Sequence, residues 1–452
     1  MSIKVNDKKG ITIIALVITI IVLLILSGVT ISMLTNENGI IKKALYAKKQ
    51  TERAEAKEII EIEVLDSLVK SGTLDMNKIK EKLETKLKIP SIDINDNLDG
   101  SIDVKYNNVE LVVKTNGEVI YKEEVENIEN EKLPITENTA PYLPKGAVVT
   151  NNNLNTGVTI RDSNKNEWVW IEVPKSIYIN IEYNNNNNNK PKNSSDYINI
   201  EMVMHKYTEK YRNGTANKDI WYSKDQHGFE SASEYNTEKN KILKSIYEYG
   251  GFYIGKYEVG TEKLRSLANE ELTTPVIKEG AYPYNNLTCL QAQQKAKELS
   301  NGGRTSSLML GVQWDLVLKY IEIKKGKTFK ELNEDSSLWG NYKDSSYSVT
   351  KGRYSEDSGK TFTKITNNYL KEKNKPVLLT TGAIEEHSIL NIYDFAGNLS
   401  EWILEYASNT NSSCTSRGGD YTYNGSEIPS SSRGGDETAF ISNNIGFRPT
   451  LY

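Results

Sequence analysis

Few side chains in this sequence of 452 residues could perform redox or metal chemistry. The two cysteines, Cys289 and Cys414, lie far apart and match no metal-binding or redox spacing. A disulfide between them would suit an extracellular protein, but two unpaired thiols are the interpretation that we favour. The three histidines, His205, His227 and His387, are scattered along the chain, which argues against a histidine-based metal centre.

A second group of side chains, near the C-terminus, is suited to binding. Residues 421–444 combine tyrosines, asparagines, serines and acidic residues, of which we single out Tyr421, Tyr423, Asn424, Glu427, Asp436, Glu437 and Asn443. Stiff aromatic side chains beside adaptable polar ones are typical of antibody binding surfaces. The segment therefore predicts a ligand-binding surface, and a set of polar loop residues without a partner is the alternative.

The elements that must carry these side chains begin with an N-terminal anchor. Residues 11–34 are rich in Ile, Val and Leu and contain no charged residue. A helix of this length exceeds a hydrocarbon core of about 30 Å, so the segment predicts a single transmembrane helix. Lys4, Lys8 and Lys9 precede it, and we expect the N-terminus in the cytoplasm and the C-terminal domain outside the cell membrane.

The motif Lys-Lys-Gly-Ile-Thr at residues 8–12, directly before the apolar helix, resembles the leader of a type IV prepilin. Residues 1–10 would be that leader. The resemblance implies cleavage between Gly10 and Ile11 and methylation of the new N-terminus. Pilins usually carry a Glu at the fifth mature position, where this chain has Ala15. The difference bears on filament assembly more than on processing.

Patterns behind the anchor predict a small pilin-like region at residues 35–125. Apolar stripes over 38–71 and 76–87 predict two helices. Three segments that alternate apolar and polar residues predict a small antiparallel sheet: 101–106, 109–114 and 117–121. Residues 126–146 contain several prolines and are expected to be a linker, so that 147–452 form a second domain.

The overall composition excludes some function classes. Hydrophobic residues make up 37% and charged residues 26% of the chain, as in soluble globular domains, so most of it should fold outside the membrane. The formal net charge is −4 and no broad basic surface is indicated, which argues against nucleic-acid binding. Five tryptophans are candidates for a core that is poor in Phe: Trp168, Trp170, Trp314, Trp339 and Trp402.

Five short motifs of the C-terminal region occur in one order along the chain. They are GGFYIGKYEV at 250–259, LWGN at 338–341, NIYDFAGNLSEW at 391–402, RGGDY at 417–421 and GFR at 446–448. Together they resemble the sulfatase-modifying factor family, which includes the formylglycine-generating enzymes. The resemblance spans about residues 147–452 and implies an α+β fold related to C-type lectins, with much loop and little regular structure.

Catalytic members of that family carry two cysteines shortly after an Arg-Gly-Gly motif, where they bind copper and perform an oxidation. Alignment on residues 417–419 puts Tyr423 and Ile428 at those positions, and neither can act as a thiolate. Copper(I) needs soft ligands, so we expect no copper and no oxidase activity. The alternative is that Cys289 and Cys414 meet in space and act instead.

The resemblance also implies a structural calcium site in the loop at residues 394–401. The matched ligands are the carboxylates of Asp394 and Glu401 and the backbone carbonyls of Gly397 and Leu399. Hard oxygen ligands of this kind suit Ca²⁺. The alternative is that Asp394 caps a turn and that Glu401 is a surface charge.

Three function classes remain. We favour a membrane-tethered cell-surface protein whose non-catalytic, calcium-stabilised domain binds an extracellular protein or glycan. The second is a formylglycine-generating-type oxidoreductase. The third is a minor pilin or pseudopilin of a type IV pilus or secretion system, with pilin-like subunits as partners. Lectin-like relatives targeted by diversity-generating retroelements vary residues just before a C-terminal Gly-Phe-Arg, which residues 446–448 resemble.

Overall fold

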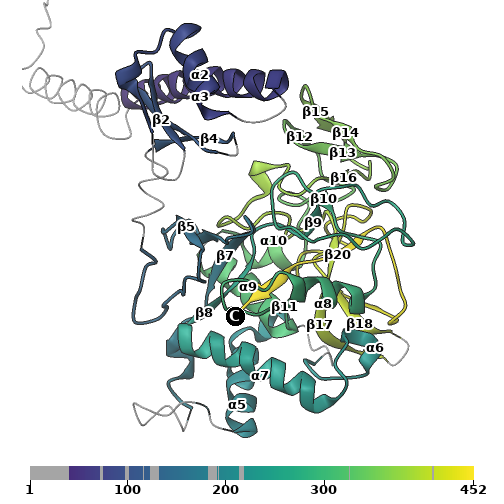
Figure 1. Ribbon diagram of the computed structural model, residues 1–452. Helices are drawn as coiled ribbons and strands as arrows, with labels where there is room; N and C mark the ends of the chain where they lie inside the picture. The colour runs from purple at the N-terminus through teal and green to yellow at the C-terminus, as the bar shows by residue number, and fades with distance from the viewer. Residues whose placement is uncertain are drawn as a thin grey trace, which may run out of the picture. The chain divides into compact units, whose positions relative to one another are not determined.

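The computed structural model describes residues 40–71, 75–96, 101–115, 117–122, 132–181, 191, 193–212, 218–324, 326–409 and 412–452. They belong to two compact units, Met1–Asn127 and Ile128–Tyr452, here called the N-terminal and C-terminal units (Figure 1). The predicted leader, the cleavage position at Gly10 and Ile11 and the predicted membrane span lie outside the described residues. Within these ranges, no helix combines the length and apolar character that a membrane crossing requires.

The N-terminal unit packs two helices on a four-stranded antiparallel sheet. The helices are α2 (Ile40–Ser71) and α3 (Met76–Thr85). A short 3₁₀ turn, η1 (Ser91–Asp93), leads into the sheet, whose strands follow in chain order: β1 (Ile94–Asp96), β2 (Ile102–Tyr106), β3 (Val109–Val113) and β4 (Val119–Tyr121). The two predicted helices and the three predicted strands, which correspond to β2, β3 and β4, are thus confirmed, except that α3 is two residues shorter than expected at its C-terminal end. The edge strand β1 was not predicted.

The apolar stripe of α2 explains this arrangement. Ala56, Ile60 and Val64 recur every fourth residue on one helix face and are at most 2% exposed. They belong to one core with the inward side chains of the sheet, among them Val104 and Leu111. The helix is stable because tertiary packing buries this stripe.

Residues 132–146, part of the segment for which the sequence predicts a linker, are packed on the C-terminal unit. Tyr142 is 7% exposed and its hydroxyl donates to the Leu451 carbonyl at 2.5 Å. Thr139 accepts from the Trp170 indole at 2.8 Å and donates to the Gly250 carbonyl. The linker prediction is therefore wrong for these residues. It was based on the prolines, and nothing in the local sequence reveals that the Tyr142 side chain packs in an aromatic cluster.

A six-stranded antiparallel sheet organises the C-terminal unit. Its spatial order is β11 (Ser306–Leu308), β21 (Pro449–Leu451), β8 (Gly251–Gly255), β7 (Glu167–Glu172), β6 (Thr159–Arg161) and β5 (Val148–Asn151). The last strand of the chain, β21, lies between β11 and β8, which come from the middle part of the sequence. All five tryptophans proposed for the core are at most 1% exposed, which confirms that prediction.

Helices surround this sheet, and α5 and α7 lie side by side (Figure 1). The helices are α5 (Ser194–Tyr207), α6 (Lys224–His227), α7 (Ala232–Tyr249), α8 (Cys289–Glu298), α9 (Gly311–Ile323) and α10 (Phe329–Asn333). The 3₁₀ turns are η2 (Lys175–Tyr178), η4 (Glu209–Tyr211) and η5 (Glu385–His387). Gly250 ends α7 at a φ of 67°, and its missing Cβ lets the Asn138 carbonyl approach. This contact joins the segment before β5 to the sheet.

A second, four-stranded sheet carries the C-terminal motifs. Its order is β19 (Arg433–Asp436), β18 (Ser412–Arg417), β17 (Ser400–Asn409) and β20 (Ile445–Phe447), with β17 and β20 parallel. The remaining strands form small sheets: β9 (Gly260–Thr261) with β10 (Tyr282–Pro283), β12 (Tyr347–Val349) with β15 (Tyr369–Lys371), and β14 (Thr363–Lys364) and β16 (Leu378–Leu379) with β13 (Arg353–Ser355). The fold is therefore mixed α and β.

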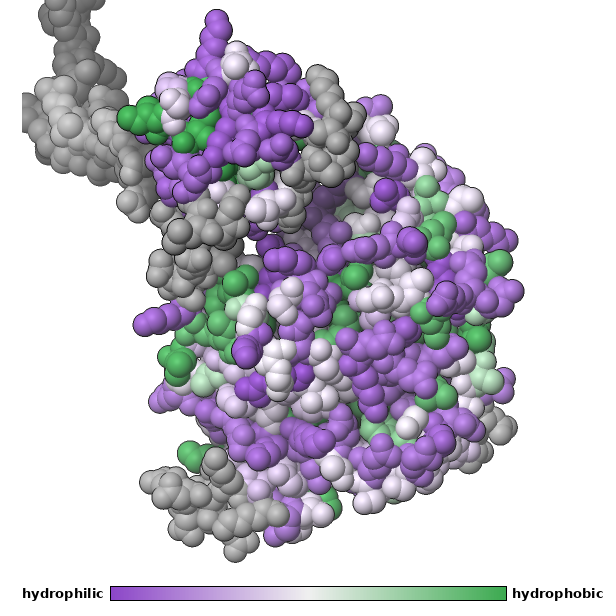
Figure 2. Space-filling view, in the orientation of Figure 1, coloured by the Kyte–Doolittle hydropathy of each residue, from purple (hydrophilic) through white to green (hydrophobic). Residues whose placement is uncertain are grey.

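The face drawn in Figure 2 is mostly hydrophilic, and its hydrophobic residues form small separate groups. Exposed apolar residues of this kind are normal on a soluble domain and mark a site only where they gather around a cavity.

Candidate functional site

Two arginines of the C-terminal motifs meet in the second sheet. Arg417 lies opposite Arg433 in the antiparallel pairing of β18 and β19. Both guanidinium groups bind the same two carboxylates, those of Asp315 on α9 and Glu405 on β17. The shortest contacts, from Arg433 and Arg417 to Asp315, are 2.6 and 2.8 Å. We call these four residues the buried charge cluster.

Because the cluster is buried, each of its charged groups depends on the others for compensation. Asp315, Glu405 and Arg417 are at most 1% exposed, and the Arg433 side chain is 6% exposed. Burial, and then the neighbouring Arg433, lower the pKa of Arg417 to about 10, so its guanidinium stays charged at neutral pH. Arg212 adds a third guanidinium, 3.6 Å from Asp315. Loss of either carboxylate would leave buried positive charge unpaired.

A pocket of about 310 Å³ lies beside this cluster, between β18, β19 and the loops at 419–428 and 440–445. We call it the β18–β19 pocket. Its lining includes Asp420, Tyr423, Ile428, Arg433, Asp436 and Phe440, together with three serine hydroxyls. Because Arg433 belongs to both, the buried charge cluster sets the position of one pocket wall.

Two of the seven predicted ligand-binding residues, Tyr423 and Asp436, line this pocket. Tyr421 does not, because it is 1% exposed and packs against Leu378 and Leu399. The prediction that Tyr421 belongs to the surface is therefore wrong: it points inward, whereas Tyr423, two residues later, is 49% exposed.

The other four predicted residues lie outside the pocket lining. Glu427 and Glu437 are exposed, and Glu427 accepts a hydrogen bond from the backbone N–H of Asn424 at 3.1 Å. Asn443 donates to the Ser358 carbonyl at 3.1 Å. Sequence reasoning missed Asp420, although it directly follows the Arg-Gly-Gly motif, and Phe440, for which no local signal exists.

The positions that the family resemblance aligns with the catalytic cysteines, Tyr423 and Ile428, both line the β18–β19 pocket. Neither thiol of the chain does. Cys289 and Cys414 are unpaired, at most 1% exposed and close enough to interact. Burial, with the neighbouring thiol, raises the pKa of Cys289 well above its ordinary value, which keeps it in the unreactive thiol form.

The predicted calcium ligands lie near a different arginine. Arg448 donates to both carboxylate oxygens of Glu401, at 2.9 to 3.2 Å, and also to the carbonyls of Gly255 and Tyr393. Asp394 accepts from the backbone N–H of Gly382 at 2.7 Å. Burial raises the pKa of Glu401 to about 7, and this effect outweighs the opposing effect of Arg448.

These contacts do not fit the expected calcium set. A calcium ion binds six to eight oxygens and takes carboxylates as its strongest ligands. Both oxygens of Glu401 already accept hydrogen bonds from a guanidinium that supplies the positive charge. Calcium at Asp394, Gly397, Leu399 and Glu401 is untested, and the alternative that these contacts favour is Arg448, in place of calcium, as the cationic partner of Glu401.

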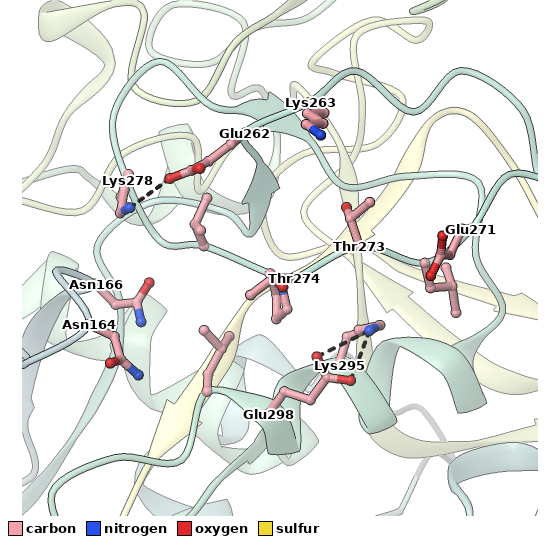
Figure 3. A pocket seen from close by; sticks show the side chains of 14 residues that line it. Asn164, Asn166, Glu262, Lys263, Glu271, Thr273, Thr274, Lys278, Lys295 and Glu298 are labelled. Atoms are coloured by element: carbon pink, nitrogen blue, oxygen red, sulfur yellow. Dashed lines mark hydrogen bonds and ion pairs between the residues drawn. The ribbon is translucent and has the colours of Figure 1, made fainter. Parts of the chain in front are cut away.

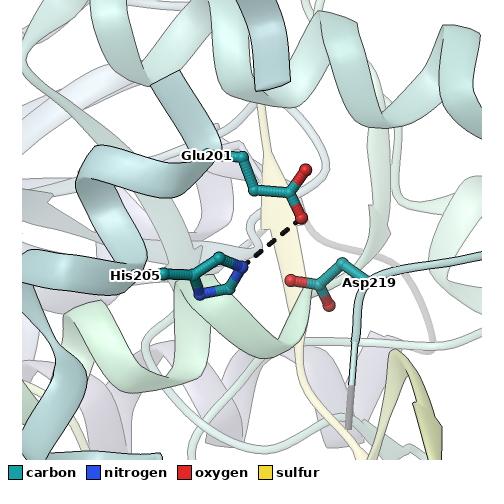
Figure 4. Close-up of side chains that lie close together, drawn as sticks. All are labelled: Glu201, His205 and Asp219. Carbon is teal, nitrogen blue, oxygen red and sulfur yellow. Dashed lines mark ion pairs between the residues drawn. The ribbon is translucent and has the colours of Figure 1, made fainter. Parts of the chain in front are cut away.

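A third cluster, of Glu201, His205 and Asp219, was not predicted from the sequence. Their ligand atoms lie within 4.8 Å of one another, and Figure 4 shows the three side chains converging from α5 and a separate segment. The spacing of four residues between Glu201 and His205 puts both on one helix face and could have revealed the pair.

The hydrogen bonds of this cluster argue against a metal. Arg212 has no acceptor atom, so its contact of 2.6 Å makes Nδ1 of His205 the acceptor. The proton of the neutral ring then sits on Nε2, which faces Glu201 at 3.4 Å and has no lone pair for a metal. Asp219 accepts from two backbone N–H groups at the start of α9, and Lys239 binds Glu201. The cluster therefore joins α5 to α9.

A larger groove of about 790 Å³ lies beside α8 and the segment 271–278 (Figure 3). Its charged side chains are mostly paired with each other, as Lys278 with Glu262 at 3.0 Å and Lys295 with Glu298 at 2.8 Å. Among the described residues that line it, none is an aromatic residue, a cysteine or a histidine. It offers hydrogen bonds but no obvious catalytic group.

Comparison with known proteins adds a match to one family model. Residues 226–450 match the family model described as sulfatase-modifying factor enzyme 1-like domain. No curated protein matches the chain. Among solved structures, variable protein 1 of Treponema denticola is similar at 14% identity and a TM-score of 0.25, over 44% of this chain and 84% of that one.

The competition between calcium and Arg448 can be tested by unfolding. Because the guanidinium neutralises Glu401, we expect EDTA to leave the melting temperature of the C-terminal unit unchanged. Arg448→Ala should lower the free energy of unfolding by about 3–5 kcal/mol, since it leaves a buried carboxyl group without its partner. Arg161→Ala, which removes a partly exposed ion pair, is the control and should cost less than about 1 kcal/mol. A melting temperature that falls with EDTA and recovers with Ca²⁺ would support the calcium set instead.

Proposed function

We propose that the sulfatase-modifying factor enzyme 1-like domain at residues 226–450 is a non-catalytic ligand-binding module, displayed on the cell surface by an N-terminal membrane anchor. One observation carries the proposal. Tyr423 and Ile428, the residues aligned with the catalytic cysteines, line the β18–β19 pocket, and no thiol does. A cavity is present at the expected position, but its walls lack the ligands that copper chemistry needs.

The surroundings of the pocket support binding. Tyr423, which is 49% exposed, and Phe440, which is 37% exposed, line the cavity, and Ile441, which follows Phe440, is 39% exposed. Large apolar side chains at the centre of a surface provide most of the binding energy in protein interfaces. The buried charge cluster supports one pocket wall, which lowers the entropy cost of binding. An extracellular protein is the partner class that this surface favours over a glycan.

A minor pilin or pseudopilin is the second candidate. The N-terminal unit supports it, because a long helix packs one apolar face on a four-stranded antiparallel sheet, as the resemblance to prepilins implies. Both candidates place the chain in the cell membrane as a single-pass protein. They differ in whether the pocket or the N-terminal unit makes the essential contact.

The binding proposal predicts a contrast between two tyrosines. In a screen of the protein against arrays of extracellular proteins and glycans, Tyr423→Ala should weaken capture by about 1–2 kcal/mol without changing the melting temperature. Tyr421→Ala should instead lower stability by about 3–5 kcal/mol, because its side chain is in the core. Tyr222→Ala, at 36% exposure, is a matched surface control. Full capture by Tyr423→Ala would contradict the proposal.

The non-catalytic part has its own test. Purified protein incubated with copper(I), oxygen and a cysteine-containing sulfatase peptide should produce no formylglycine, because no thiol pair lines the pocket. An aldehyde-reactive probe and mass spectrometry of the peptide measure this. A copper-dependent aldehyde on the cysteine would establish the oxidoreductase alternative.

Processing tests the anchor. Expression with a prepilin peptidase should give a mature chain that begins at Ile11, as read by N-terminal sequencing, and expression without the peptidase should leave the leader in place. An N-terminus at Met1 or Ser2 in the presence of active peptidase would reject the prepilin interpretation.

A further inference from the structure

The charged residues that line the β18–β19 pocket do not neutralise one another. Its charged lining residues are Asp420, Arg433 and Asp436. Most of the Arg433 guanidinium is engaged elsewhere: Nε binds Glu405, Nη2 binds Asp315, and Nη1 donates to the Tyr211 carbonyl at 2.7 Å. Among the described residues its ion pairs are with Asp315 and Glu405, and not with Asp420 or Asp436.

The two carboxylates lack a cationic partner. Asp420 is 3% exposed and accepts only from neutral groups, the Thr422 backbone at 2.8 Å and hydroxyl and the Asn444 amide at 3.0 Å. Asp436 is half-buried, and among the described residues its carboxylate has no hydrogen-bond or ion-pair partner. Burial raises the pKa of Asp436, as expected for a carboxylate that nothing compensates.

The size of the pocket and the residues at its edge limit the class of ligand that it can bind. A cavity of about 310 Å³ is at the small end of ligand sites and suits one side chain rather than a folded segment. Exposed Tyr423 and Phe440 at its edge could stack on a cation. Ser400, Ser416 and Ser432 add hydroxyl oxygens that accept hydrogen bonds from a planar guanidinium or an ammonium.

Other ligand classes fit less well. An anion would face two carboxylates, and an apolar side chain would bury Asp436 without a partner. A bound metal ion would need convergent ligands, and across the ranges that the structure describes, Asp420 and Asp436 belong to no group of side chains close enough to share one.

We propose that the β18–β19 pocket receives a basic side chain, an arginine or a lysine, of an extracellular protein partner, with Asp436 as its ion-pair partner. The inference rests on the proposed binding function and names the chemistry that the site recognises. Asp420 contributes a fixed negative charge from below the surface, and Tyr423 and Phe440 cover the aliphatic part of the inserted chain.

The test uses the full chain in detergent micelles and N-acetylated pentapeptides, with glycine at the outer positions and arginine, lysine, citrulline, leucine or glutamate at the centre. Citrulline has the shape of arginine without its charge. Calorimetry or ligand-observed NMR should show arginine and lysine peptides binding about tenfold or more tightly than the others. Asp436→Asn, which preserves side-chain shape, should remove this preference, whereas Glu437→Gln, the exposed neighbouring acid, should leave it unchanged.

Equal binding of the arginine and citrulline peptides, a preserved preference in Asp436→Asn, or no measurable binding of the arginine peptide would each overturn the inference. The proposed binding function fails separately. If capture of an extracellular partner still depends on Tyr423 while Asp436→Asn captures it normally, the binding module stands and its ligand is not basic. If neither residue affects capture, both proposals fail.

Discussion

The buried charge cluster of Asp315, Glu405, Arg417 and Arg433 is the constraint on which the C-terminal motifs depend. Each of its members comes from a different element, α9, β17, β18 and β19. Two arginines directly opposite each other on paired strands would repel, so the pairing of β18 with β19 requires both carboxylates underneath. Any shift of one strand would leave a buried charge unpaired, at a cost of several kcal/mol. The cluster therefore fixes strand register and, through Arg433, one wall of the pocket.

This dependence explains a repeated motif that the sequence alone leaves unexplained. Arg-Gly-Gly-Asp occurs at 417–420 and again at 433–436, and only the strand pairing reveals that both arginines serve one cluster. Their partner Asp315 lies about 100 residues earlier in the chain. Local periodicity predicted the helices and the sheet of the N-terminal unit, because packing there follows repeating apolar positions. It contains no information on ion pairs between distant segments.

Because local sequence patterns contain no information on contacts between distant segments, only part of the site could be predicted. Composition drew attention to residues 421–444, and Tyr423 and Asp436 of this segment do line the pocket. The irregular turn between β18 and β19 has no period of two or of 3.6 residues, so nothing local distinguished buried Tyr421 from exposed Tyr423. Likewise, the family resemblance implied calcium at Asp394 and Glu401. The contribution of Arg448, at the far end of the chain, is a tertiary contact that no local pattern reveals.

Arginine guanidinium groups thus lie near both regions for which the family resemblance implies a metal or catalysis. These regions are the predicted calcium loop and the positions aligned with the catalytic cysteines. Arg448 compensates Glu401 near the expected calcium loop, and Arg417 and Arg433 bind Asp315 and Glu405 beside the β18–β19 pocket. A guanidinium needs neither a thiolate nor an open coordination position, and it holds a carboxylate in fixed geometry through several hydrogen bonds. These arginines do not pair with Asp436, which lines the β18–β19 pocket and has no positively charged partner among the described residues. Under the proposed binding function, the two carboxylates that line this cavity would select a positively charged side chain, because such selection needs only a fixed charge in a preformed site.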